Sequence, residues 1–154
     1  MKRLRIGVAS LLVFLCLIGT ASAEWWDTTT PPRSRAGVQM PGTWWEWVKG
    51  GSRLYGTNPF LVAAVMDVEA NGWRAGRLGH SRYFGPCGFN SRCSIPSDVL
   101  LRPEVQIRWA CRILAGSPQR RLRRYNETWW KDNYIRDVLG LAKRMERDAA
   151  NKLK

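Results

Sequence analysis

Glu69 is the side chain of this sequence best placed to do chemistry, because it ends a run of apolar residues. The run from Asn58 to Glu69 reads NPFLVAAVMDVE, which predicts one short buried helix with a carboxyl group in its last turn. Asn58 is a favourable N-cap, Pro59 suits the first helical position, and Asn71-Gly72 supplies a stop. The helix C-terminus and burial both disfavour an ionised carboxyl, so we expect a raised pKa for Glu69. An acid that stays neutral at about pH 6 to 7 can protonate the leaving oxygen of an acetal.

A lone Glu at a helix end is more often an ordinary solvated acid, so the motifs that follow Glu69 decide its interpretation. They are a loop with Gly85 and Asn90, a helix that opens at Pro103-Glu104, the pair Tyr125-Asn126, and Tyr134 at the head of a last amphipathic helix. This order resembles the lytic transglycosylases with a goose-lysozyme-like domain. In that family an apolar helix ends in Glu-Ser and precedes a Gly-Leu-Met-Gln-Ile-Asn type loop, a Pro-Glu helix, a Tyr-Asn pair and a later Tyr. The resemblance covers residues 44–145.

The sequence departs from the family pattern at three places. Ala70 stands where the family has Ser, and Cys87-Gly88 stands where the loop has Met-Gln, so two substrate-contacting side chains are missing. Glu127 follows the Tyr-Asn pair in place of a small residue. We therefore expect the loop beyond that pair to differ in shape from the family.

The resemblance implies a peptidoglycan lytic transglycosylase that needs no cofactor and no metal. Glu69 would act as both acid and base on the bond between N-acetylmuramic acid and N-acetylglucosamine, and the product would be a 1,6-anhydro sugar. By the same resemblance, substrate-binding or acid-tuning roles fall on Gly85, Asn90, Tyr125, Asn126 and Tyr134, with Trp73 beside the same cleft. Tyr125 or Tyr134 would orient Glu69 through a phenolic hydrogen bond.

Two alternatives to this function stay open. A muramidase-type hydrolase of the same fold needs a second carboxylate, for which Glu127, Asp132 and Asp67 are candidates. Asp67 lies two residues from Glu69 and therefore points elsewhere on a helix. A non-catalytic, cationic module that docks on the cell wall is the other alternative, because the usual Ser and Gln are missing.

The first residues predict export. Lys2, Arg3 and Arg5 precede an apolar stretch at 6–19, and Ala21-Ser22-Ala23 fits a cleavage site. We expect residues 1–23 to be a signal peptide, 24–42 a flexible linker and 43–154 the lysozyme-like domain, located in the periplasm or cell envelope. An uncleaved membrane anchor is the alternative. After cleavage we expect no stable membrane insertion, because the last helix mixes acidic with basic residues.

The chain is strongly basic, with a net charge of +13 that becomes +10 when the three basic residues of the signal peptide are removed. A cluster of four arginines lies at 120–124. For an exported protein, we expect its partners to be peptidoglycan glycan strands and their acidic peptides rather than nucleic acid. A role in solubility alone is an equal alternative. A secretion or conjugation apparatus is a further candidate partner, since small exported enzymes of this kind often open the wall for one.

The coarse pattern predicts one small all-α domain with a long substrate-facing loop at 72–94. A first helix is expected at 43–55, and further helices begin at Pro103 and near Tyr134. Two apolar stripes mark the core faces of these later helices. Their residues are Ile107, Ala110, Cys111 and Leu114 in one helix, and Ile135, Val138, Leu139, Ala142 and Met145 in the other.

Three cysteines remain after export, and in an oxidising compartment one pair is expected. Cys87 with Cys93 is the favoured disulfide because both lie in the long loop, while Cys111 on an apolar stripe is read as a buried hydrophobe, although it could reach either loop cysteine. His80 is the only histidine, and the cysteine spacing fits no zinc module.

The chain has nine tryptophans, which need an explanation in so short a sequence. Trp44, Trp45, Trp47 and Trp109 are read as packing. For Trp73 and the pair Trp129-Trp130, which would flank the cleft, core packing and a stacking platform for sugars are equally open.

Overall fold

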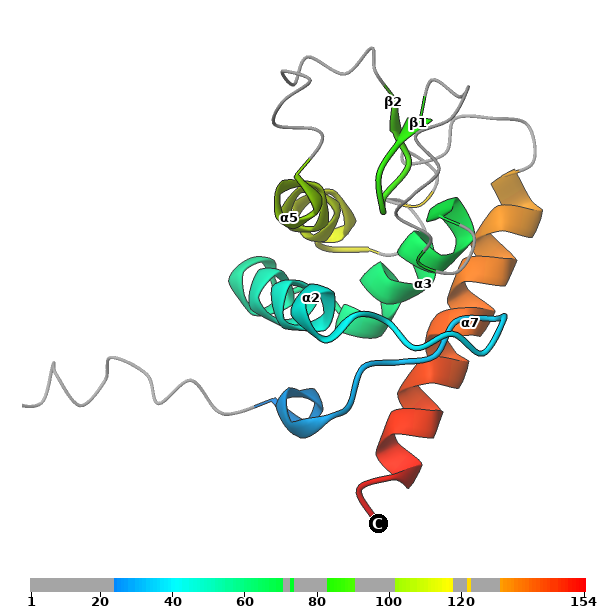
Figure 1. Cartoon of the computed structure of the whole chain (residues 1–154). Helices are drawn as coiled ribbons and strands as arrows, with labels where there is room; N and C mark the ends of the chain where they lie inside the picture. Colours follow the sequence, from blue (N-terminus) through cyan, green and yellow to red (C-terminus); the bar gives the residue numbers. More distant parts are fainter. Residues whose placement is uncertain (1–23, 71–72, 74–82, 91–101, 118–121, 123–130) are drawn as a thin grey trace, which may run out of the picture.

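The computed structural model of the chain describes residues 24–70, 73, 83–90, 102–117, 122 and 131–154. This part consists of α-helices, one 3-10 turn and one short antiparallel hairpin (Figure 1). The elements are η1 (Trp25–Thr28), α2 (Gly42–Tyr55), α3 (Pro59–Ala70), β1 (Tyr83–Phe84), β2 (Phe89–Asn90), α5 (Pro103–Leu114) and α7 (Lys131–Asn151). The all-α fold class expected from the sequence is confirmed for the described residues.

Helix α3 forms the centre of the core, because its side chains are apolar on every side. All its residues from Pro59 to Asp67 are buried. Helix α7 packs along α3, while α2 packs on α5 and both of these also contact α3 (Figure 1). A helix enclosed in this way has little room for polar side chains along its length, so its two carboxyl groups, Asp67 and Glu69, are confined to its C-terminal end.

The predicted helix starts are confirmed at α3 and α5. Asn58 Oδ1 accepts hydrogen bonds from the backbone N–H groups of Phe60 at 2.8 Å and Leu61 at 3.3 Å, which is N-cap geometry. Pro59 and Pro103 occupy the first positions of their helices, where no N–H is needed.

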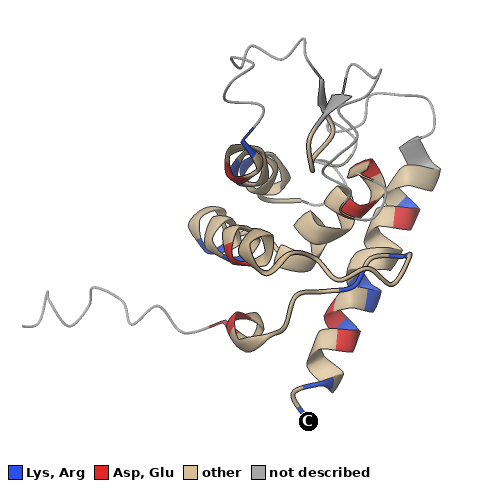
Figure 2. Cartoon of the chain, viewed as in Figure 1, with Lys and Arg blue, Asp and Glu red and all other residues tan. Residues whose placement is uncertain are grey.

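The predicted apolar stripes of α5 and α7 face the core. Ile107, Ala110, Cys111 and Leu114 are buried in α5. In α7, Val138, Ala142 and Met145 are buried, while Ile135 and Leu139 are half-buried against the core. Basic and acidic residues are interspersed along the rest of α7 (Figure 2), so its outer face is mixed in charge, as the sequence indicated.

The segment at 24–42 does not behave as the expected flexible linker, and this expectation needs correction. Trp26 is 8% exposed and Met40 is 2% exposed, so both side chains belong to the core. Trp45 Nε1 donates a hydrogen bond of 3.1 Å to the carbonyl oxygen of Thr29. The segment lacks a helical period. It packs on the helices because removing its large apolar side chains from water stabilises the folded chain.

Residues 33–39, which we call the N-terminal loop, turn back on themselves through a bridge between Arg33 and Gln39. The loop lies at the C-terminal end of α3. There Asp67 Oδ2 accepts the backbone N–H of Arg35 at 2.9 Å, and Trp73 Nε1 donates to the carbonyl oxygen of Val38 at 2.9 Å. These two hydrogen bonds tie the chain on both sides of Glu69 to the same loop.

The packing role predicted for four tryptophans is correct for three of them. Trp44 and Trp45 are buried, and Trp47 is half-buried against the core. Trp109 is 38% exposed, with the guanidinium carbon of Arg112 5.6 Å from its ring centre, so its predicted role is wrong. Trp109 lies two residues after Ile107, which places it off the buried stripe of α5.

None of the helices in the described part of the chain is long and apolar enough to cross a membrane. The expected signal peptide at 1–23, His80 and the pair Trp129-Trp130 lie outside the described residues. Of the basic cluster at 120–124 only Leu122 is described, and its side chain is buried.

Replacing Asn58 with Ala should lower the free energy of unfolding by about 1 kcal/mol, because two N–H groups of α3 lose their acceptor. Thermal or denaturant unfolding measures this change. Asn151→Ala, at the exposed end of α7, is the matched control and should change stability by less than about 0.5 kcal/mol. Equal effects of the two substitutions would contradict the capping role of Asn58.

Candidate active site

Glu69 lies in the last turn of α3 and is half-buried, as the sequence predicted. The hydroxyl of Tyr134, near the start of α7, donates a hydrogen bond of 2.8 Å to Glu69 Oε1. Tyr134 is 8% exposed and Glu69 is half-buried, so this bond is partly sheltered from water. The packing of α7 along α3 therefore brings together two residues that are 65 positions apart in the chain. The family resemblance implied the acid role for Glu69 and named Tyr134 as one candidate for its hydrogen-bond partner.

Burial raises the pKa of Glu69 above its ordinary value of 4.5, and the hydrogen bond from Tyr134 opposes this rise. Burial also raises the pKa of the Tyr134 hydroxyl, and the nearby charge of Glu69 adds to this effect. Tyr134 therefore stays protonated and can donate its hydrogen bond to the ionised form of Glu69. Glu69 is a carboxyl group whose neutral form is favoured by its surroundings, which is the property that a general acid requires.

The turn of the hairpin covers the other side of Glu69. Strands β1 and β2 pair antiparallel, with Phe84 opposite Phe89, and residues 85–88 form the turn between them. Gly88 has a φ of 61°, and a Cβ atom at this position would lie 2.8 Å from Glu69 Oε2 and 3.0 Å from Glu69 Cβ. Both the conformation and the close contact require glycine.

The two oxygens of Glu69 thus have different neighbours. Oε1 accepts the hydrogen bond from Tyr134, and Oε2 lies against the backbone of Gly88. While Tyr134 donates to Oε1, a proton on neutral Glu69 would lie on Oε2. Cys87-Gly88 replaces a substrate-contacting side chain of the family pattern, but in the structure Gly88 lets the turn approach the carboxyl group.

Gly85 contacts α5 rather than Glu69. Its φ is 68°, and a Cβ atom here would lie 2.3 Å from Nε2 of Gln106. Gln106 is 1% exposed, and its Oε1 accepts the backbone N–H of Cys87 at 3.2 Å. Gln106 was not predicted from the sequence, although an amide next to Ile107 on the buried stripe of α5 is a signal, because a buried polar side chain needs a partner.

The two described cysteines are both buried, and Cys87 lies in the turn beside Glu69. Burial raises the pKa of Cys87 well above its ordinary value, and the charges of Cys111 and Glu69 add to this rise. Burial raises the pKa of Cys111 to about 12, and Cys111 is a buried hydrophobe as predicted. Both groups are thus neutral thiols at physiological pH when reduced. Cys93 lies outside the described residues, so the expected bridge between Cys87 and Cys93 stays a prediction.

Trp73 is packing, which corrects its expected place among the substrate-binding residues. Its side chain is 5% exposed, and its indole N–H donates a hydrogen bond to the carbonyl oxygen of Val38. A ring buried in this way offers no open face to a sugar. Its φ of 64° is rare for a residue with a side chain and allows the chain to turn after α3.

Asp67 faces away from Glu69, as its place on the helix indicated. Its carboxylate is buried, accepts the N–H of Arg35, and has the Arg35 side-chain Nε at 3.6 Å. It therefore anchors the N-terminal loop. This role makes Asp67 a poor candidate for a second catalytic carboxylate.

Several predicted site residues fall outside what the structure describes. Tyr125, Asn126 and Glu127 are among them, and only the backbone of Asn90 and Asp132 is described. Asn90 lies in β2, opposite Tyr83 and two residues after Gly88. The groove that these residues would form with Glu69 stays a prediction.

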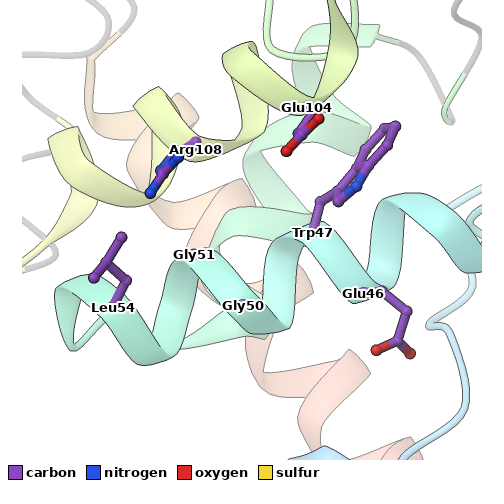
Figure 3. Close-up of a pocket in the computed structure, with 7 residues that line it drawn as sticks. All are labelled: Glu46, Trp47, Gly50, Gly51, Leu54, Glu104 and Arg108. Atoms are coloured by element: carbon purple, nitrogen blue, oxygen red, sulfur yellow. The ribbon is translucent and has the colours of Figure 1, made fainter.

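A separate hollow of about 250 Å³ lies between α2 and α5 (Figure 3). Trp47 and Glu104 stand together at one end, Arg108 and Leu54 lie toward the other, and Gly50 and Gly51 belong to the helix below. None of its lining residues belongs to α3, α7 or the hairpin, so it is not part of the Glu69 site. No group of three or more potential metal ligands occurs among the described residues.

Comparisons of the chain with protein-family models, with curated proteins and with solved structures give no match. The resemblance to lytic transglycosylases therefore depends on the sequence pattern alone. Chemical roles for Glu69 and Tyr134 depend on the contacts described above.

The raised pKa of Glu69 predicts a pH dependence of stability. The folded chain favours the protonated carboxyl, so the wild type loses stability as pH rises from the unfolded value of 4.5 through the folded pKa. Glu69→Gln is neutral at every pH and lacks this loss. We expect the Tm of the Gln variant, relative to wild type, to be higher at about pH 8 than at about pH 4. A Tm difference that is the same at both pH values would contradict a raised pKa.

Gly88→Ala should disturb Glu69, because the added methyl group meets both Oε2 and Cβ of that residue. Gly56 is a matched control, since its φ is 64° and a Cβ atom there meets nothing within 4 Å. Both substitutions incur backbone strain of about 1–2 kcal/mol, but only Gly88→Ala should also shift the carboxyl pKa of Glu69, measured by ¹³C NMR titration. An unchanged Glu69 pKa in folded Gly88→Ala would show that the turn does not contact the carboxyl group.

Proposed function

We propose that this protein is a peptidoglycan lytic transglycosylase in which Glu69 is the single acid and base. The observation that carries the proposal is the environment of Glu69, a half-buried carboxyl group with a raised pKa and a hydrogen bond from Tyr134. The order of motifs from the apolar helix to Tyr134 supplies the substrate class, and the basic composition suits an anionic polymer. With the signal-like residues 1–23, the site of action would be the periplasm or cell envelope.

The first chemical step uses neutral Glu69. Its Oε2 proton passes to the oxygen between N-acetylmuramic acid and N-acetylglucosamine, and the bond from C1 of the muramic sugar to that oxygen breaks. The acetamido group of the muramic sugar bonds to C1 and stabilises the positive charge that develops there. The Tyr134 hydroxyl, which stays protonated, stabilises the carboxylate left on Glu69 through its hydrogen bond to Oε1.

The second step uses Glu69 as a base. The 6-hydroxyl of the muramic sugar loses its proton to the Glu69 carboxylate, and its oxygen bonds to C1 as the acetamido group leaves. The ring closes to a 1,6-anhydro sugar, and Glu69 is neutral again for the next turnover. One carboxyl group therefore serves both steps, and no water is consumed.

A single acid distinguishes this proposal from glycoside hydrolysis. Hydrolases of the usual kind place two carboxyl groups across the scissile bond, about 5–9.5 Å apart. Asp67, the other carboxyl of α3, is buried against the N-terminal loop. A hydrolase of the same fold would require Glu127 or Asp132, and a wall-docking module would require no acid at all.

The decisive experiment is mass spectrometry of the soluble products after purified residues 24–154 digest peptidoglycan. The wild type should release anhydro-muropeptides, and Glu69→Gln should lower the rate by about 100-fold or more, since it keeps the shape but cannot transfer a proton. Asp67→Asn is the matched control, because it makes the same chemical change two residues earlier. It should retain product formation per folded molecule.

Each other outcome has a distinct meaning. Wild-type activity in Glu69→Gln would contradict the single-acid mechanism. Products with reducing ends would establish hydrolysis and a second carboxylate instead. Binding to sacculi without any products would favour the docking module.

A further inference from the structure

The side chain of Gln106 is an unusual feature of the core. It is 1% exposed and lies on the buried side of α5, next to Ile107 and facing away from the exposed Arg108. Burying an amide is unfavourable unless its polar atoms are hydrogen-bonded. Its Oε1 accepts the backbone N–H of Cys87 at 3.2 Å, so Gln106 connects α5 to the turn of the hairpin.

Gly85 and Gln106 fit one another closely. A Cβ atom at residue 85 would lie 2.3 Å from Nε2, 2.6 Å from Oε1 and 2.7 Å from Cδ of Gln106. The amide of Gln106 thus occupies the space that a side chain at residue 85 would need. The hydrogen bond from Cys87 and this contact with Gly85 hold two of the four turn residues against α5.

The same turn reaches Glu69 at its other end. The backbone N–H of Gly88 donates to the carbonyl oxygen of Gly85 at 3.3 Å, so the place of Gly88 depends on the place of Gly85. Gly88 in turn lies against Oε2 of Glu69, the oxygen not used by Tyr134. A continuous series of contacts runs from Gln106 through the turn to the carboxyl oxygen that would hold the acidic proton.

We propose that Gln106 is a positioning residue that holds Gly88 against Oε2 of Glu69, and so determines how that oxygen meets the glycan and how far water reaches it. The inference rests on the proposed function for its effect on catalysis. Its effect on the environment of Glu69 is independent of any activity. Gln106 does not touch the reacting atoms and acts only through the turn.

Loss of this support has a defined consequence for Glu69. Among the described residues, the titratable groups that face Glu69 are Tyr134 from α7 and Cys87 from the turn, and burial keeps both protonated at neutral pH. Burial is also the main cause of the raised Glu69 pKa. When the turn moves away, water reaches Oε2, the pKa of Glu69 falls toward 4.5, and less of the residue is in the acid form at a given pH.

The test compares wild type with Gln106→Met, which keeps the side-chain length but removes the acceptor for Cys87. Gln39→Met is the matched control, because Gln39 is exposed in the N-terminal loop. The Glu69 carboxyl pKa is measured by ¹³C NMR titration, and kcat and KM are measured on soluble, uncrosslinked glycan strands. We expect Gln106→Met to lower the Glu69 pKa, to lower kcat by about 10- to 100-fold with KM little changed, and to move the alkaline limb of the kcat profile to lower pH. Gln39→Met should match wild type.

A second variant reaches the same contact from the other side. Gly85→Ala pushes the Gln106 amide away, and Gly56→Ala controls for backbone strain. If Gly85 and Gln106 act through one turn, the double variant should lose no more kcat than the more severe single variant. If Gln106→Met does not fold, Gly85→Ala compared with Gly56→Ala tests the proposal alone.

The proposal is overturned if folded Gln106→Met or Gly85→Ala keeps the wild-type Glu69 pKa and kcat while only its Tm falls. That result would make Gln106 a stabilising residue alone. Failure of the positioning role is distinct from failure of the proposed function. The latter would appear as wild-type activity in Glu69→Gln. The NMR titration decides the positioning role even where no glycan is cleaved.

Discussion

The burial of α3 is the constraint on which the rest of the structure depends. Its side chains are apolar on every side, so α2, α5, α7 and the N-terminal segment all have to cover it. Helix α7 covers its C-terminal end and thereby brings the Tyr134 hydroxyl to Glu69. The packing that hides the helix from water also partly buries its last carboxyl group, and this burial raises the pKa of Glu69.

The sequence was informative wherever structure depends on neighbouring residues. Asn58 and Pro59 marked the start of α3, Pro103 marked α5, and the apolar stripes marked the buried faces of α5 and α7. The placement of Glu69 followed from the same local pattern, and its pairing with Tyr134 followed from the family resemblance. The spacing of apolar residues follows the helical repeat, and this repeat determines which side chains share a face of the helix.

The sequence was uninformative where contacts join distant segments. The segment at 24–42 has no period, yet its side chains fill spaces that only the folded helices create. From the sequence, Trp73 was a candidate platform for stacking sugars. In the structure its indole N–H donates to a carbonyl oxygen of the N-terminal loop. The roles of Gly88 and Gln106 depend on how closely the hairpin turn approaches α3 and α5. The local sequence pattern does not predict this distance. The environment of Glu69 is therefore less predictable than the helices that build it.

The separation between Glu69 and Tyr134 has a consequence for synthesis of the protein. A chain is made from its N-terminus, so the acid leaves the ribosome 65 residues before the tyrosine that it needs. Until α7 has emerged, α3 lacks the helix that packs along it, and its carboxyl group lies in water with an ordinary affinity for protons. A nascent or prematurely terminated chain that lacks α7 would therefore carry Glu69 without its hydrogen bond from Tyr134. The environment of Glu69 thus forms only after α7 has been synthesised.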